Sequence, residues 1–130
     1  MSRNQKFYIC KHCGNIADLI KDSQVSLVCC GEKMSELVPN SVEASVEKHL
    51  PVVTKGVGAD SISVQIGSVL HPMESGHNIV FVYVESEQGG QRKCLKVGGE
   101  PKLEFSFSSD KPIAVYAYCN LHGLWKTEVK

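Results

Sequence analysis

The chain has 130 residues, which is the length of one conventional domain and too short for two, so any second domain must be very small. Fourteen Lys and Arg residues balance fourteen Asp and Glu residues, and the absence of net charge argues against nucleic acid or an anionic membrane as a partner. There is no long apolar run, and the polar start of the chain has no hydrophobic segment behind it, so we expect no membrane span, no secretion signal and a cytoplasmic location.

Six cysteines and five histidines stand out from this ordinary composition. In a reducing compartment the thiols stay free, so metal ligation is favoured over disulfides. The two residue types are segregated, because four cysteines lie within the first thirty residues and four histidines lie after residue 48. Pro39, Asn40 and Ser41 interrupt the strand and helix patterns between them. We therefore predict two domains, residues 1–37 and residues 38–130.

The first segment has the pattern of a small β-rich metal knuckle. Short apolar runs at residues 7–9 and 25–28 predict strands, and each leads into a pair of cysteines that a glycine follows. A segment of about 37 residues cannot bury enough apolar surface to fold alone. A bound metal would supply the missing stability.

The four cysteines of this segment form two unlike pairs. Cys10 and Cys13 have Cys-X-X-Cys spacing, which turns two thiolates toward one ion. Cys29 and Cys30 are adjacent, so both reach the same ion only if the backbone bends, and we expect a distorted tetrahedron. The spacing does not choose between structural zinc and redox iron, and a catalytic thiol pair is the weaker alternative. His12 is expected to point to solvent.

The second segment has the pattern of an antiparallel β-sandwich. Apolar and polar residues alternate at 61–66 and 103–108, and residues 79–84 and 113–118 are apolar enough for central strands. Turn signals separate these runs, one of them at Gly89-Gly90. No helical periodicity extends beyond about two turns. Six or seven short strands in about 90 residues predict an immunoglobulin-like sandwich, so the whole chain is expected to be mainly β.

Candidate metal ligands of the second segment fall where its strands end. The loops of a sandwich gather at its two poles, so these side chains can meet at one end. Four imidazoles and one thiolate exceed what tetrahedral zinc requires, and they favour five-coordinate iron with an open sixth position. A thiolate opposite that position would push electron density toward a bound substrate. The five candidates are His49, His71, His77, Cys119 and His122.

Glu47 and Lys48 directly precede the first of these histidines. They are either an ordinary surface ion pair or a part of the site. Beside an open metal position, Lys48 would attract a small anion and organise proton delivery, and Glu47 could reach the metal when no substrate is there.

In these motifs the chain resembles the desulfoferrodoxin family, the two-iron class of superoxide reductase. The similarity runs over almost the whole length, through His77 and the segments 8–16, 27–31, 47–52, 67–73 and 119–125. It implies a desulforedoxin-like or rubredoxin-like N-terminal domain with a four-Cys iron. It also implies a neelaredoxin-like sandwich in which four His and one Cys hold the catalytic iron.

The resemblance further implies one-electron reduction of superoxide to hydrogen peroxide without oxygen release. Lys48 would steer the substrate, and Glu47 would be the carboxylate ligand of the ferric state. A homodimer and a rubredoxin-like electron donor follow from the same resemblance. The chain departs from many relatives at Asn78 and Phe81, where they carry an aromatic residue and a Trp, which concerns packing and not ligation. Cys94 belongs to neither ligand set and is expected to be a small apolar strand residue.

Two other functions fit parts of the pattern. An electron carrier of the rubredoxin kind would use the four-Cys iron and would need no histidine cluster. A non-enzymatic binding sandwich with structural zinc would be colourless. Metal content separates the three, because two irons per chain indicate the reductase, one iron the carrier, and zinc alone the binding module.

Overall fold

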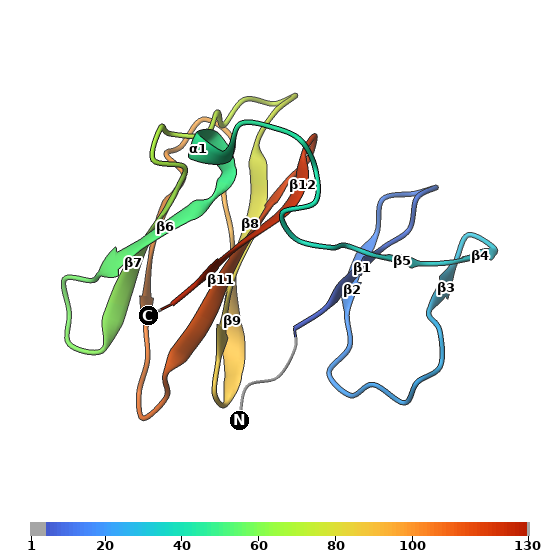
Figure 1. Ribbon diagram of the computed structural model, residues 1–130, viewed down its shortest axis with the longest axis horizontal. Coiled ribbons are helices and arrows are strands. Elements are labelled where there is room, and N and C mark those ends of the chain that lie inside the picture. Colours follow the sequence, from blue (N-terminus) through green and yellow to red (C-terminus); the bar gives the residue numbers. More distant parts are fainter. Residues whose placement is uncertain (1–4, 130) are drawn as a thin grey trace. The chain divides into compact units, whose positions relative to one another are not determined.

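The computed structural model describes residues 5–129, and strands dominate it. The one helix among these residues has four residues, and no helix within this part of the chain is long and apolar enough to cross a membrane. The chain divides into two compact units, one ending at Val38 and the other beginning at Pro39 (Figure 1). The predicted class, mainly β with a cysteine knuckle followed by a sandwich, is confirmed.

The small unit consists of a three-stranded antiparallel sheet and a two-stranded hairpin. Among residues 5–38 only Phe7 and Cys10 are buried, so the apolar core is far smaller than independent folding requires. The sheet has the order β2-β1-β5 and the hairpin pairs β3 with β4. The elements are β1 (Phe7–Ile9), β2 (Ile16–Asp18), β3 (Val28–Cys29), β4 (Glu32–Lys33) and β5 (Ser35–Glu36).

The strand predictions for this unit are partly right. The strand at residues 7–9 is confirmed as β1. The strand at residues 25–28 is wrong except at its last residue, because only Val28 enters β3. Gln24 has a φ of 70°, a left-handed turn just before this run, and the Val25 side chain is 74% exposed. The apolar run therefore has no sheet to join until it reaches the cysteines.

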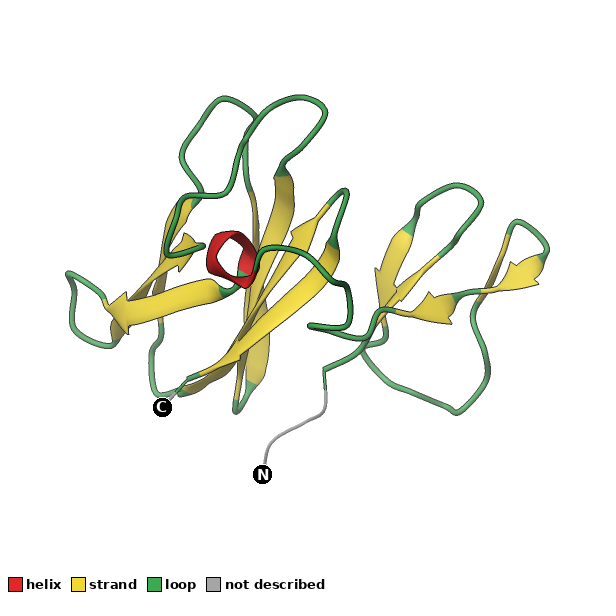
Figure 2. Ribbon diagram, turned by 45° about the horizontal axis from the view of Figure 1, so that its top comes forward, coloured by secondary structure: helices red, strands yellow, loops and turns green. Residues whose placement is uncertain are grey.

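The larger unit is a sandwich of a three-stranded and a four-stranded antiparallel sheet (Figure 2). The first sheet has the order β10-β7-β6, and the second has the order β12-β11-β8-β9. The fourth strand, β9, forms a hairpin with β8 and so joins the second sheet. The elements are α1 (Val46–His49), β6 (Pro51–Lys55), β7 (Ser61–Ile66), β8 (Ile79–Ser86), β9 (Gly89–Cys94), β10 (Lys102–Ser106), β11 (Pro112–Cys119) and β12 (Gly123–Glu128).

The core of the sandwich lies between the two sheets and follows from period-two alternation. Alternate residues of each strand point inward, so β7 contributes Val64 and Ile66 while β8 contributes Val82 and Val84. Cys119, at the end of β11, belongs to the same buried cluster. The candidate ligand Cys119 is therefore held in place by the packing of the core.

The expected turn at Gly89-Gly90 is displaced by two residues. Glu87 and Gln88 form the turn, and the two glycines begin β9. Gly90 pairs with Glu85 of β8, and a Cβ on Gly90 would overlap the Tyr83 ring. The glycine therefore serves close packing within the sheet, a requirement that a turn motif does not distinguish. Cys94 ends the same strand opposite Phe81 and is exposed.

Asn40 fixes the start of the sandwich unit. Its backbone N–H donates to the Leu124 carbonyl at 2.9 Å, and its side chain exchanges hydrogen bonds with the Lys126 backbone at 2.8 and 3.1 Å. The chain is thereby held beside β12 before it reaches α1. A segment that looks like a linker in the sequence is an anchored edge of the fold.

Candidate metal centres

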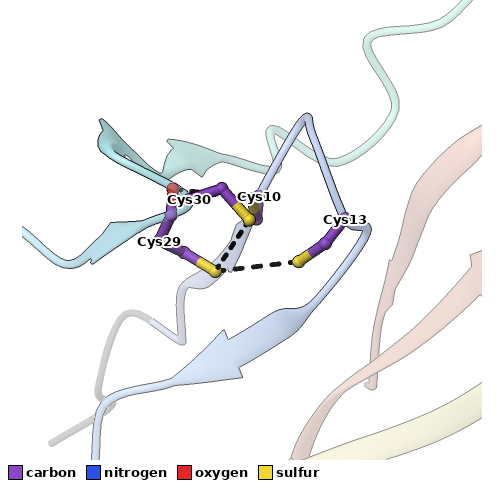
Figure 3. Close-up of side chains that lie close together, drawn as sticks. All are labelled: Cys10, Cys13, Cys29 and Cys30. Atoms are coloured by element: carbon purple, nitrogen blue, oxygen red, sulfur yellow. Dashed lines mark hydrogen bonds between the residues drawn. The ribbon is translucent and has the colours of Figure 1, made fainter.

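The four cysteines of the small unit converge, with their sulfur atoms all within 4.8 Å of one another (Figure 3). Cys29 Sγ lies 3.7 Å from Cys13 Sγ and 4.0 Å from Cys30 Sγ. The Cys10–Cys13 turn is closed by the Gly14 N–H, which donates to the Cys10 carbonyl at 2.8 Å. Cys30 has a φ of 53° and Gly31 a φ of 76°, so the backbone bends where two adjacent side chains must face one point.

The electrostatics of this cluster favour a bound cation. The backbone N–H of Cys13 is the main cause that lowers the pKa of Cys10 to about 6. The hydrogen bond shared with Cys10 is the first cause that raises the pKa of Cys30 to about 12, and the pKa of Cys29 is raised in the same way. One cysteine therefore ionises easily. Its negative charge opposes the ionisation of a second cysteine unless a cation lies among the sulfurs.

Two polar side chains surround the four-Cys cluster. Asn15 Nδ2 lies 3.8 Å from Cys29 Sγ and points a donor at that sulfur. His12 is exposed, as expected, but its Nε2 lies 3.0 Å from a carboxylate oxygen of Glu32. This contact joins the loop of the first cysteine pair to the strand that follows the second.

The second cluster lies at one pole of the sandwich. His49 ends α1, His71 and His77 lie in the loop between β7 and β8, and Cys119 and His122 bracket the turn from β11 to β12. The ligand atoms of His49, His77, Cys119 and His122 lie within 4.8 Å of one another. The His71 ring adjoins them, with its centroid 4.7 Å from that of His49 and 4.7 Å from that of His77.

Backbone carbonyls orient the imidazoles of this cluster. Because a carbonyl only accepts, Nδ1 of His49 donates to Ser45 O at 2.6 Å, and Nδ1 of His71 donates to Pro72 O at 2.7 Å. Nε2 is then the free lone pair of both rings. His122 is turned the other way, with Nδ1 3.1 Å from His49 Nε2 and 3.8 Å from Cys119 Sγ.

Two imidazole nitrogens in this cluster have no hydrogen-bond partner among the described residues and are suited to bind a metal. Nε2 of His71 and Nε2 of His77 are buried and have no hydrogen-bond partner within residues 5–129. Leaving such atoms unsatisfied costs about 1–3 kcal/mol each. A cation among the rings would satisfy both, so the donor set fits a bound metal.

Burial keeps the histidines in the form that binds metal. Desolvation is the largest cause that lowers the pKa of His71 to about 4, and it also lowers the pKa of His49. Both rings are only 2% exposed. They are therefore neutral at physiological pH, and a neutral imidazole is the metal ligand.

Glu47 and Lys48 are exposed on α1, in the turn that ends at His49. The Ser45 hydroxyl donates to Glu47 Oε1 at 3.4 Å, and the described residues hold no salt bridge between Glu47 and Lys48. The Glu47 carbonyl accepts the Val69 N–H at 3.1 Å, which ties α1 to the loop that carries His71. The surface ion pair considered from the sequence is therefore not formed in this part of the chain.

Three residues near the second cluster were not assigned a role from the sequence. Trp125 stacks on His49 and donates from Nε1 to the His122 carbonyl at 3.1 Å. Asn78 and Asn120 join the loops that carry His77 and Cys119. Trp125 could have been found as the end of the Cys119–Trp125 motif, whereas the asparagine contacts have no sequence signal.

A cysteine knuckle and a sandwich with a His and Cys pole define a class of small protein with two separate metal centres. Two family models match the chain. The Desulfoferrodoxin model matches residues 41–128, and the model of the desulfoferrodoxin N-terminal domain matches residues 2–37. The chain belongs to the desulfoferrodoxin family.

The similar proteins cover different fractions of the chain. Desulfoferrodoxin of Nitratidesulfovibrio vulgaris is 40% identical over 128 residues, which are 98% of this chain and 99% of that protein. The crystal structure of the superoxide reductase from Treponema pallidum has a TM-score of 0.79 and 31% identity, and covers 97% of this chain and 100% of that one. The superoxide reductase (1Fe-SOR) from Giardia intestinalis has a TM-score of 0.53 and 26% identity, and covers 65% of this chain and 98% of that one.

Proposed function

We propose that this protein is a superoxide reductase, which converts superoxide to hydrogen peroxide with one electron and two protons and releases no oxygen. One observation carries the proposal: four imidazoles and a thiolate converge at one pole, with buried Nε2 atoms of His71 and His77 that lack a hydrogen-bond partner among the described residues. The similar proteins from Treponema and Giardia are named superoxide reductases.

Iron is the proposed metal of both centres. Mixed imidazole and thiolate donors suit iron, and four thiolates suit iron or zinc. Iron bound at the pole supplies the single electron that superoxide requires. The proposed ligands are Cys10, Cys13, Cys29 and Cys30 for the first centre, and His49, His71, His77, Cys119 and His122 for the second.

Lys48 is proposed as the residue that attracts the substrate. Superoxide is a small anion, and the chain as a whole has no net charge, so attraction must be local. Lys48 is exposed and directly precedes the buried His49. Its ammonium group is also a proton donor near the place where peroxide forms.

Glu47 is proposed as the carboxylate ligand of the oxidised centre. It lies on the same helical turn, its side chain is exposed, and the Ser45 hydroxyl is its hydrogen-bond donor. The family resemblance supports this role. Replacement of Glu47 is expected to change the absorption spectrum of the oxidised protein more than its rate.

The four-Cys centre is proposed to be separable from the pole and to take no part in substrate chemistry. The Giardia protein named 1Fe-SOR matches only 65% of this chain, which supports a separable role for the remainder. The proposed domains are residues 1–37 and 38–130. The family resemblance supports a homodimer and a rubredoxin-like donor, and a cytoplasmic location is proposed with them.

Metal analysis and superoxide consumption test the proposal together. The purified protein should contain two irons per chain, and it should consume superoxide, given a reductant, with hydrogen peroxide formed and no oxygen evolved. Iron in the four-Cys site with no superoxide consumption would instead indicate an electron carrier. Zinc as the sole metal would contradict both.

A further inference from the structure

Asn120 lies between two proposed ligands, yet its side chain turns toward a third. Its Oδ1 accepts the Asn78 N–H at 2.9 Å, and its Nδ2 donates to the Gly76 carbonyl at 3.1 Å. The Asn120 backbone N–H also donates to the Asn78 carbonyl at 3.1 Å. These three bonds contact the residues on both sides of His77.

The His77 loop is closed from within as well. Glu74 and His77 exchange backbone hydrogen bonds at 2.9 and 3.2 Å, which makes a four-residue turn. The Asn78 side chain donates from Nδ2 to the Glu74 carbonyl at 2.9 Å and to the Ser75 carbonyl at 3.4 Å. Asn78 therefore satisfies two backbone carbonyls of the turn with its side chain.

The exposure of this turn explains why it needs such bonds. Glu74, Ser75 and Gly76 are all exposed, so no apolar packing restrains the backbone that leads into His77. Cys119, in contrast, is fully buried at the end of β11. The Asn120 side chain thus connects an exposed loop to the buried end of a strand.

We infer that Asn120 is a positioning residue, which holds His77 at a fixed distance from Cys119 so that both reach one metal. Asn78 assists it, because its side chain keeps the turn from Glu74 to His77 closed. This inference rests on the proposed function, because it assigns both ligands to the same ion. Removal of partners that orient metal ligands typically costs about 10- to 100-fold in metal affinity.

The test loads the metal-free full chain with Co²⁺ and follows its removal by a chelator through the visible absorption. Asn120→Ala should release cobalt from the His and Cys pole about 10-fold faster, with altered absorption bands. The four-Cys centre lies in the other unit and serves as an internal control, so its release should not change. Asn78→Ala should have a smaller effect, because it leaves the bonds between the Asn78 backbone and Asn120 in place.

Two further variants separate positioning from folding. Leu121→Ala is the matched control, because Leu121 is 59% exposed in the same turn, and its release should equal wild type. Asn120→Asp keeps the acceptor for the Asn78 N–H but sets a carboxylate oxygen against the Gly76 carbonyl, so its cobalt release should also be faster than that of the wild type. It replaces Asn120→Ala if that variant fails to fold.

The outcomes distinguish failure of the inference from failure of the proposed function. Wild-type release and wild-type bands in both Asn120 variants overturn the inference and leave the proposed function standing. Loss of thermal stability alone, with unchanged release, also overturns it. A wild-type chain that binds cobalt at both centres but, when loaded with iron, consumes no superoxide overturns the function. A chain that binds cobalt only at the cysteines overturns the shared ligand assignment.

Discussion

The ring of Trp125 lies almost parallel to that of His49, with ring centroids 4.9 Å apart and an angle of 24° between the planes. The same indole donates from Nε1 to the His122 carbonyl at 3.1 Å. Trp125 is 2% exposed and belongs to β12. One side chain of the sheet therefore supports two histidines that lie 73 residues apart in the sequence.

Two replacements of Trp125 should lower the free energy of unfolding by different amounts, because they remove different interactions. Trp125→Phe keeps an aromatic ring against His49 and removes the hydrogen bond to His122, so we expect a loss of about 1–2 kcal/mol in the free energy of unfolding. Trp125→Leu also removes the stacking and should cost about 3 kcal/mol. Urea unfolding followed by circular dichroism measures both. Equal stability of the two variants would contradict a role for the stacked ring.

Gly67 is required where the His71 loop passes under α1. It has a φ of 85°, and a Cβ there would overlap the Val69 carbonyl oxygen and would lie 2.7 Å from the Lys48 carbonyl oxygen. Gly67→Ala should therefore destabilise the fold by about 1–3 kcal/mol and displace α1 from the pole. Urea unfolding gives the first quantity, and the rate of superoxide consumption reports the second.

Gly98 provides the matched control for this substitution. Its φ is 90°, yet no atom lies within 4 Å of the place of a Cβ. Gly98→Ala should carry the backbone strain alone, without displacement of Lys48 or any change in rate. If both variants lost activity equally, close approach at Gly67 would not be the cause.

The convergence of the candidate ligands could be predicted from the sequence because the pattern of apolar residues shows where the strands end. Alternation located β7, and a nearly continuous apolar run located β11. Because the loops of a sandwich meet at its poles, His71 and Cys119 could be placed together. The fold class followed from the same strand patterns. The short cysteine knuckle could be predicted because a segment of that size needs a metal.

The remaining features depend on packing that has no sequence period. The run at residues 25–28 looks like a strand, but only its last residue, Val28, pairs with a neighbouring strand. Gly90 looks like a turn residue, but it makes room for Tyr83. The bonds from Asn120 to Gly76 and Asn78 join positions more than forty residues apart, and polar contacts of this kind leave no pattern in the chain.

Stability of the metal-free protein should fall as the pH falls from about 6.5 to 4. In the folded chain burial lowers the pKa of His71 to about 4, whereas the unfolded chain takes up a proton near 6.5. The unfolded state therefore binds more protons in this window, and acid favours it. His71 alone accounts for at most about 3 kcal/mol, and His49 shifts in the same direction.

Tryptophan fluorescence measures this pH dependence in the sandwich unit, because Trp125 is the single tryptophan of the chain. Urea unfolding at pH 7.5 and pH 4.5 gives the difference in stability. His71→Gln should reduce it, and His12→Gln should not, because His12 is exposed in the other unit. A pH dependence that persists unchanged in His71→Gln would show that burial of this ring is not its source.

Lys48→Ala should slow superoxide consumption by about 10-fold at low salt, because a local positive charge raises the rate of encounter with a small anion. Lys111→Ala is the control, since Lys111 precedes β11 and lies about 26 Å from the Cys119 end of that strand. Pulse-generated superoxide at several salt concentrations measures both rates. Added salt should slow the wild type and Lys111→Ala, and should affect Lys48→Ala much less. If Lys48→Ala kept the wild-type rate and salt dependence, another group would have to attract the substrate.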